Sequence, residues 1–167
     1  LFDHLSMQDV VTFTGSHSTG IKLKQHKNII EHSIRFNMEA DSLNCCVLGE
    51  DATPDSEEFL LYIKEVAREL TTKAGQRCTA IRRIIVPNSR VQDVITALQK
   101  RLSGVVIGDP SLDDVKMGPL VGMDQLAEVS ARVGDLSRSS EKVFEFSGDF
   151  KKNGHNIEHG AFFRPTL

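Results

Sequence analysis

Hydrophobic positions along the chain follow two different spacings. Segments rich in apolar and β-branched residues predict strands at 10–14, 33–38, 44–48 and 81–86, and the unbroken run at 10–14 is typical of a strand buried on both faces. Apolar residues that recur every three or four positions are typical of amphipathic helices, and they occupy 54–70, 91–102 and 126–133. Shorter apolar runs predict further strands at 105–107 and 143–146.

Capping residues indicate where the helices begin and end. Asp55 and Glu58 have the spacing of a capping box ahead of the first long helix, and Ser89 and Gln92 repeat it ahead of the second. Gly104 follows the second apolar stripe, and glycine is common just past the end of a helix.

The alternation of strands and helices predicts the fold class. Parallel strands need long crossover connections, which helices usually supply, and parallel sheets are covered on both faces. The sequence therefore predicts an α/β fold of three layers, with a mostly parallel sheet and helices on both of its faces.

Composition excludes several classes of protein. The 167 residues are 40% hydrophobic, which suffices for one good core. The formal net charge is −3 and no long basic run is present, so nucleic acid is not an expected partner. No apolar run approaches the length of a membrane span. The 3 cysteines cannot form a disulfide framework and favour a reducing compartment, with the cytoplasm as the expected location.

Cys78 is the first candidate for chemistry. It lies within the segment 75–80, Gly-Gln-Arg-Cys-Thr-Ala, between a predicted helix and a predicted strand, with Gly75 as the helix stop. On a turn beside Arg77 the thiol would be partly exposed, and the positive charge would favour its thiolate. The alternative is an ordinary packed cysteine, because free cysteine is among the most buried residue types.

A glycine-bounded turn follows the first strand. The segment 15–20, Gly-Ser-His-Ser-Thr-Gly, opens a helix, where free N–H groups and the positive end of the helix dipole could hold a phosphate. It has neither the Lys-Ser/Thr of a P-loop nor the Gly-x-Gly-x-x-Gly of a dinucleotide fold. A tight turn that uses glycine for backbone freedom is the alternative interpretation.

Glu39 is the second candidate for chemistry. It lies between two apolar runs, where a charged group needs a partner or a function, although a solvated turn carboxylate is the alternative. Cys45 and Cys46 point to opposite faces of a predicted strand, and we expect both to pack. His155 and His159 are four positions apart, but glycines bracket them, so a metal site is not expected.

These separated motifs together resemble the aldehyde dehydrogenase family. In chain order they are Phe13-Thr14-Gly15-Ser16 with Gly20, Glu39, the segment 75–80, Met117-Gly118-Pro119-Leu120 after Gly108-Asp109-Pro110, and Phe162-Phe163-Arg164-Pro165-Thr166-Leu167. The resemblance covers essentially the whole chain. It implies that 1–37 end a cofactor-binding domain and that 38–167 belong to the catalytic domain, truncated at both ends relative to the family.

The family resemblance implies a role for each candidate. Cys78 would attack an aldehyde to give a thiohemiacetal and then a thioester, and its main-chain N–H would help to hold the oxyanion. Glu39 would activate the water that hydrolyses the thioester, and partial burial would suit it to that role. Four further residues would contact the cofactor, the first two near its pyrophosphate and the third near its adenine: Gly15, Ser16, Thr19 and Gly20.

A narrower resemblance concerns the run 38–51. It departs from the Glu-Leu-Gly-Gly usual in the family and is similar to the dehydrogenase part of the bifunctional ring-opening enzymes of phenylacetate degradation. In those enzymes a second, enoyl-CoA hydratase-like part hydrolyses oxepin-CoA. The resemblance implies oxidation of a CoA-linked semialdehyde to its acid with NADP or NAD. Ala40 and Asp41 replace the residues usual beside the nicotinamide, so cofactor contacts would differ there.

Two other functions stay open at this point. A CoA-acylating aldehyde dehydrogenase would release its thioester to CoA and would not need a base at Glu39. A non-catalytic scaffold of the same fold would have an inert Cys78. Because the chain begins at Leu1 and a strand follows almost at once, we expect it to be cut from a longer chain, and to be inactive alone. The family also implies a homo-oligomer for the full-length protein.

Overall fold

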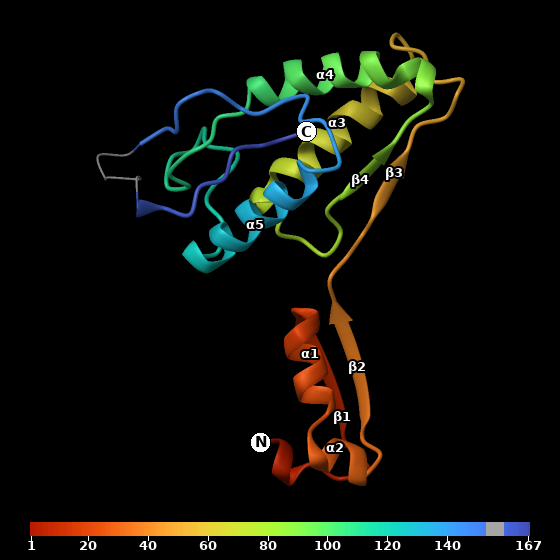
Figure 1. Ribbon diagram of the computed structural model, residues 1–167, viewed down its shortest axis with the longest axis vertical. Helices are drawn as coiled ribbons and strands as arrows, with labels where there is room; N and C mark the ends of the chain where they lie inside the picture. Colours follow the sequence, from red (N-terminus) through yellow and green to blue (C-terminus); the bar gives the residue numbers. More distant parts are fainter. Residues whose placement is uncertain (153–158) are drawn as a thin grey trace. The chain divides into compact units, whose positions relative to one another are not determined.

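The computed structural model describes residues 1–152 and 159–167 (Figure 1). The chain forms two compact units, unit 1 (Leu1–Ser42) and unit 2 (Leu43–Leu167). Helices and parallel strands occur in both units, which confirms the predicted α/β class. Within the described residues, the parallel pairing takes the form of two separate two-stranded sheets.

Unit 1 is a strand–helix–strand arrangement. Its elements are η1 (Phe2–His4), β1 (Val10–Gly15), α1 (His17–Lys24), α2 (Lys27–Glu31) and β2 (Arg35–Ala40). β1 pairs in parallel with β2, in a register that runs from Val10 opposite Arg35 to Gly15 opposite Ala40. The second strand begins two residues later than predicted, because Ser33 has a φ of 49° and turns the chain after α2.

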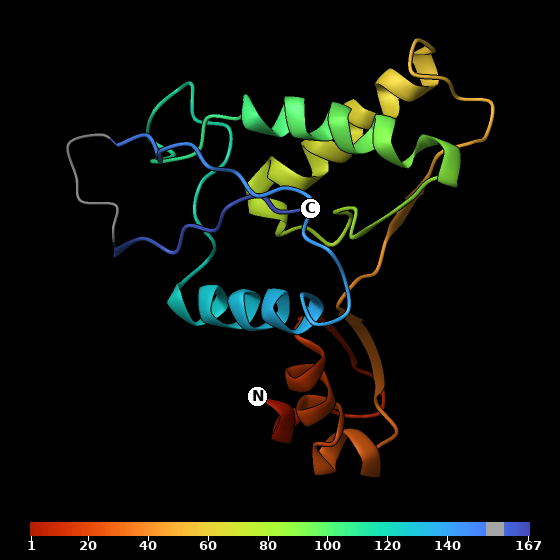
Figure 2. The ribbon, with the colours of Figure 1, turned by 45° about the horizontal axis from the view of Figure 1, so that its top comes forward.

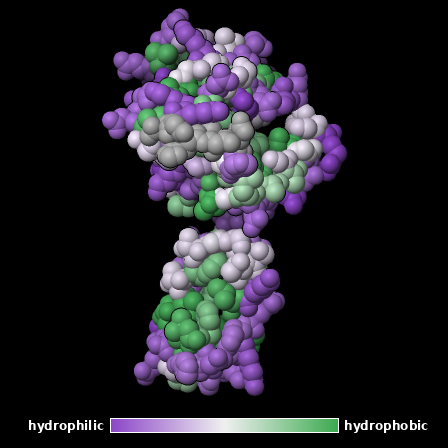
Figure 3. Space-filling model, turned by 90° about the vertical axis from the view of Figure 1, so that its left-hand side faces the viewer, coloured by the Kyte–Doolittle hydropathy of each residue, from purple (hydrophilic) through white to green (hydrophobic). Residues whose placement is uncertain are grey.

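Close packing in unit 1 depends on Gly20 of α1. Gly20 is buried, and a Cβ built there would lie 2.3 Å from the Met38 Sδ and 3.2 Å from Cε1 of Phe13. The missing side chain therefore lets α1 lie directly on the strand pair. The unit nevertheless leaves large apolar side chains exposed, among them Met7, Val10 and Ile30, and apolar surface is visible on one of its faces (Figure 3).

Unit 2 contains the second parallel strand pair and the long helices. Its elements are β3 (Cys45–Val47), α3 (Glu57–Thr71), η2 (Thr72–Gly75), β4 (Arg83–Ile85), η3 (Asn88–Arg90), α4 (Val91–Ser103) and α5 (Met123–Leu136). β3 pairs in parallel with β4, with Cys45 opposite Arg83 and Val47 opposite Ile85. α3 and α4 lie side by side (Figures 1 and 2).

The main core of unit 2 lies between these two helices and the strand pair. Its most buried side chains are Val66 of α3 and Val94, Leu98 and Leu102 of α4. The predicted apolar faces of both helices are thus the faces that pack. α5 is different, since none of its residues is buried and its apolar stripe is only half-covered.

Helix starts differ from the predicted capping boxes. Ser56, one residue after the expected Asp55, caps α3, and its hydroxyl oxygen accepts the Phe59 N–H at 3.2 Å. Ser89 does not cap α4, because it lies inside the short helix η3, and Arg90 occupies the capping position without a side-chain hydrogen bond. Gly104 is at the end of α4 as predicted.

The two short strands predicted at 105–107 and 143–146 are not formed. Ile107 forms a single bridge with Met117, and Glu145 forms a single bridge with Thr166. One bridge per segment satisfies too few main-chain groups to continue a ladder. None of the helices in the described part of the chain is long and apolar enough to cross a membrane.

Tyr62 links α3 to both strands of unit 2. Its hydroxyl lies 3.2 Å from the carbonyl oxygen of Cys46 on β3 and 3.4 Å from that of Ile85 on β4. Burial is the main cause that raises the pKa of Tyr62 to about 12, from an ordinary value of 10.0. The neutral hydroxyl is therefore the form that the folded chain favours.

Replacing Tyr62 by Phe should lower the free energy of unfolding by about 1 kcal/mol at neutral pH, because a hydroxyl that bonds main-chain oxygens is lost. Since the folded pKa lies above the unfolded one, the contribution of Tyr62 should be complete below pH 10.0 and should fall as pH rises toward about 12. Urea unfolding at several pH values measures both effects. Leu61→Ala, at an exposed neighbouring position of the helix, is the control. An unchanged free energy of unfolding in Tyr62→Phe would contradict a stabilising role of the hydroxyl.

Candidate active site

The turn that carries Cys78 begins with an unusual backbone. After α3, three consecutive residues have positive φ, namely Lys73 at 52°, Ala74 at 53° and Gly75 at 71°. α3 ends at Thr71, four residues before the predicted stop, and Gly75 is instead the last residue of the short helix η2. The chain then runs through Cys78 and enters β4 at Arg83.

The three cysteines have different surroundings. Cys78 is exposed on its turn, so it is not the packed cysteine of the alternative interpretation. Cys46 is half-buried against the core, and burial first, with its neighbour Cys45 second, raises the pKa of its thiol. Cys45 is exposed, which makes the prediction that it packs wrong. Alternation along β3 puts it on the face opposite Cys46, where the core of unit 2 does not extend.

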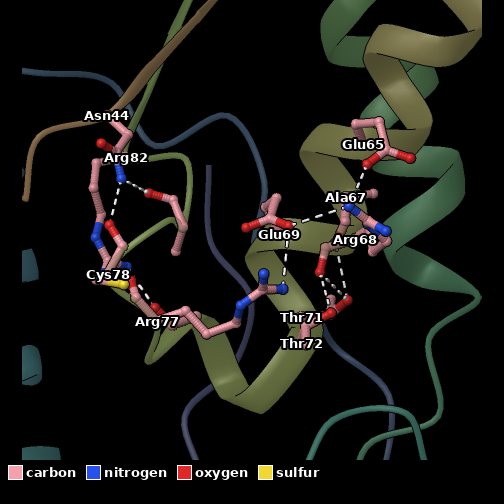
Figure 4. A network of polar contacts seen from close by, with 12 residues as sticks. Asn44, Glu65, Ala67, Arg68, Glu69, Thr71, Thr72, Arg77, Cys78 and Arg82 are labelled. Carbon is pink, nitrogen blue, oxygen red and sulfur yellow. Dashed lines mark hydrogen bonds and ion pairs between the residues drawn. The ribbon is translucent and has the colours of Figure 1, made fainter.

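Asn44 holds the cysteine turn against β3. Its side-chain amide donates to the carbonyl oxygens of Cys78 at 2.6 Å and Ala80 at 3.2 Å (Figure 4). Its own carbonyl oxygen accepts the N–H groups of Arg82 and Arg83, at 2.9 and 3.1 Å. Sequence reasoning did not single out Asn44. The available signal was its place at the first position of the predicted strand 44–48, where an asparagine can bond neighbouring backbone.

Arg77 does not direct its charge at the thiol. Its side chain runs from the turn toward α3 and away from the Cys78 sulfur, and its Nη1 lies 3.2 Å from the Glu69 Oε1 (Figure 4). The Glu69 side chain is only 9% exposed, and Arg68 lies 3.5 Å from the same oxygen. The expectation that Arg77 favours the thiolate directly therefore has no support in this geometry. Arg77 instead ties the turn to α3.

Gln76 links the turn to the segment 117–120. Its Nε2 donates to the Lys73 carbonyl at 2.9 Å and to the Pro119 carbonyl at 3.5 Å. Its Oε1 accepts the Val121 N–H at 2.9 Å. Gln76 and the Met-Gly-Pro-Leu run, which are distant in sequence, are thus held together by hydrogen bonds. A cavity of about 350 Å³ lies beside them, lined by residues that include Gly75, Gln76 and Leu120 but not Cys78.

Glu39 lies inside β2, opposite Thr14 of β1, rather than at a junction after the strand. Its side chain is exposed, so the partial burial expected of it is not present in the described residues. Glu39 belongs to unit 1 and Cys78 to unit 2. The predicted meeting of this carboxylate and this thiol at one reacting carbon stays a prediction.

The segment 15–20 forms the N-terminal turn of α1. Ser16 is the capping residue, and its Oγ accepts the Thr19 N–H at 3.3 Å and lies 2.9 Å from the Thr19 hydroxyl. The N–H groups of His17 and Ser18 donate to no other described residue. These two donors and the positive helix end can receive an anionic group.

A metal centre has no support in the structure. Among the described residues, no group of three or more His, Cys, Asp or Glu side chains could hold a metal ion. His155, one member of the histidine pair considered from the sequence, lies outside the described residues, and His159 lies within them.

Comparison with known proteins identifies the family of this chain. Residues 2–167 match the profile of the aldehyde dehydrogenase family, and the chain belongs to that family. It is 41% identical over all of its 167 residues to the 3,4-dehydroadipyl-CoA semialdehyde dehydrogenase of Aromatoleum evansii. The chain spans about a third of that relative, 32% of its length.

Solved structures share the fold. The betaine aldehyde dehydrogenase of Staphylococcus aureus, in complex with NAD+, matches 95% of this chain with a TM-score of 0.78 and 24% identity. A C291A mutant of aldehyde dehydrogenase C from Pseudomonas syringae, in complex with NAD+ and octanal, also matches 95%, with a TM-score of 0.77 and 24% identity. The chain covers 30% of each of these structures.

Replacing Arg77 by Gln should destabilise the chain by about 1–3 kcal/mol, because the buried Glu69 carboxylate loses a charged partner. Glu69→Gln in the same chain should restore part of that loss, since no buried charge is left unpaired. Denaturant unfolding of the two single variants and the double variant measures the coupling. Strictly additive effects would show that the ion pair does not hold the turn to α3.

Proposed function

We propose that this chain supplies the nucleophile and the general base of an NAD(P)-dependent aldehyde dehydrogenase that oxidises a CoA-linked semialdehyde to its acid. The observation that carries the proposal is the exposed Cys78 on a turn fixed by main-chain hydrogen bonds. Membership of the family and the activity for which the 41% identical relative is named support it. Residues 1–37 would complete the cofactor-binding domain and 38–167 would belong to the catalytic domain.

Cys78 would begin the reaction. Its thiolate adds to the aldehyde carbon, the carbonyl electron pair moves to oxygen, and a thiohemiacetal forms. When the hydride leaves that carbon, the oxygen electrons return to form the carbonyl of a thioester on Cys78. An exposed thiol on a rigid turn can accept the substrate without unfolding of the surrounding core.

Glu39 would complete the reaction. Its carboxylate takes a proton from water, the resulting oxygen nucleophile attacks the thioester carbon, and the acid departs from the Cys78 sulfur. A base is needed at this step because water is a poor nucleophile at neutral pH. Transfer of the acyl group to CoA would not need it, so Glu39 is the residue that distinguishes the two outcomes.

The turn before α1 would hold the cofactor. NADP or NAD, when bound, supplies the hydride acceptor of the reaction. The N–H groups of His17 and Ser18 are available to a pyrophosphate, and Ser16 keeps the turn in place by capping the helix. Gly15, Thr19 and Gly20 would complete this contact surface, with Gly20 acting through the close packing of α1 on the strand pair.

The proposed substrate class is that of the A. evansii relative, which is named as a CoA-semialdehyde dehydrogenase. We further propose a place in phenylacetate catabolism, in the cytoplasm, in a multifunctional and oligomeric enzyme. Because the chain spans 32% of that relative, the remaining active-site groups would come from further segments of a longer polypeptide, and the 167 residues alone should show no turnover.

Replacing Glu39 by Gln in the complete enzyme should slow steady-state turnover by about 10²- to 10⁴-fold, because the general base is lost. The first turnover of reduced cofactor should be retained, since Cys78 still attacks the aldehyde. Rapid-mixing absorbance separates the two phases, and mass spectrometry detects the accumulated thioester. Glu31→Gln, on the exposed surface of α2, is the matched control. Unchanged hydrolysis in Glu39→Gln, or full activity only with added CoA, would contradict the assignment.

Cys78 should be alkylated several-fold faster than Cys45 by iodoacetamide at neutral pH. Both thiols are exposed, so exposure alone predicts equal rates, whereas a catalytic environment favours Cys78. Peptide mapping by mass spectrometry gives both rates in one sample of the complete enzyme. Equal labelling would support the scaffold interpretation in which Cys78 is inert.

A further inference from the structure

We propose that Arg82 is a positioning residue that aims the main-chain N–H of Cys78 at the oxygen of the reacting aldehyde. This inference rests on the proposed function, because it concerns the oxyanion that forms when Cys78 attacks. Arg82 lies four residues after Cys78, just before β4, and none of the motifs in the sequence drew attention to it.

The Arg82 guanidinium spans the start of the cysteine turn. Its Nη1 donates to the Gly75 carbonyl at 2.7 Å, and its Nη2 donates to the Arg77 carbonyl at 3.3 Å (Figure 4). The Arg77 carbonyl also accepts the Ala80 N–H at 3.1 Å. Two donors therefore fix the direction of this carbonyl.

The direction of the Arg77 carbonyl determines the direction of the Cys78 N–H. Both belong to one planar peptide group, and the described backbone contains no cis peptide bond, so the N–H points opposite to the carbonyl. With its carbonyl held by Arg82, the peptide presents its N–H on the side away from the guanidinium. Among the described residues the Cys78 N–H has no hydrogen-bond acceptor, which leaves it available to a substrate oxygen.

Apart from the Ala80 N–H, Arg82 is the group that holds the Arg77 carbonyl among the described residues. Asn44 bonds the Cys78 carbonyl, which belongs to the next peptide group. The Arg77 side chain is engaged with Glu69. An arginine suits the position because its planar fork can reach two carbonyls at once, whereas a lysine ammonium concentrates its donors at one point.

The expected effect follows from the reaction itself. As sulfur bonds to the aldehyde carbon, the carbonyl electron pair becomes a full negative charge on oxygen, and an N–H already aimed at that oxygen stabilises it. Alkylation by iodoacetamide also uses the thiolate, but it displaces iodide from a saturated carbon and develops no oxyanion. Loss of N–H positioning should therefore slow attack on the aldehyde but not alkylation. Loss of the whole turn structure should slow both reactions.

The test uses the complete enzyme with Arg82→Gln and Arg82→Lys. Arg82→Gln should slow the first turnover of reduced cofactor by about 10- to 100-fold, somewhat less than direct loss of an oxyanion donor. Its rate of Cys78 alkylation should stay within about twofold of the parent, because the thiolate itself is not changed. Arg82→Lys should recover part of the first-turnover rate, since one carbonyl bond can be kept.

Arg164→Gln is the matched control. This arginine also donates to two main-chain carbonyls, those of Phe146 at 3.1 Å and Gly148 at 2.7 Å, but neither belongs to the cysteine turn. The Arg164→Gln variant should have a lower melting temperature than the parent enzyme and an unchanged rate of first turnover. If the melting temperature of Arg82→Gln is much lower than that of Arg164→Gln, the role of Arg82 is assessed from Arg82→Lys instead.

Three outcomes would overturn the inference. A parental first-turnover rate in Arg82→Gln would show that Arg82 is dispensable. A parallel loss of first turnover and alkylation would show that Arg82 maintains the turn as a whole. If the parent enzyme gives neither a first turnover nor alkylation of Cys78, the proposed function fails and the role of Arg82 falls with it.

Discussion

The turn between α3 and β4 depends on hydrogen bonds to main-chain carbonyls. Asn44 bonds the carbonyls of Cys78 and Ala80, and Arg82 bonds those of Gly75 and Arg77. An irregular turn cannot satisfy these groups with a helical or sheet ladder, so side chains supply the donors. The same bonds fix the backbone on both sides of the exposed thiol, and the possible chemistry of Cys78 depends on them.

The turn is also connected to elements that are distant in sequence. The Arg77–Glu69 ion pair joins it to α3, and Gln76 joins it to the segment 117–120. These contacts bring the Gly-Gln-Arg-Cys run and the Met-Gly-Pro-Leu run together in the folded chain. Each run alone resembles an ordinary loop, whereas together they hold the turn that carries the exposed Cys78. The rigidity comes from polar contacts at the rim of the core rather than from burial of the cysteine.

Sequence patterns predicted which helices and strands occur in this chain better than they predicted where each begins and ends. The apolar stripes of α3 and α4 were identified because both helices pack on the core of unit 2, and β1 and β2, which pair in parallel, were identified from runs rich in apolar residues. The cap at Ser56 and the single bridges of Ile107 and Glu145 were missed, since capping and pairing depend on the local path of the backbone. Cys45 was misjudged because alternation identifies two faces of a strand without saying which is covered.

The sequence by itself determined the family, the α/β class and the identity of the candidate nucleophile. Motif spacing suffices for those, because it records which chemical groups are present and in what order. Only the tertiary structure revealed that Arg77 pairs with Glu69, and that Asn44 and Arg82 hold the turn. The Arg77–Glu69 pair is chosen by how the turn folds back on α3. The bonds of Asn44 and Arg82 end on main-chain carbonyl oxygens that every residue carries, so side-chain types along the chain did not identify these partners.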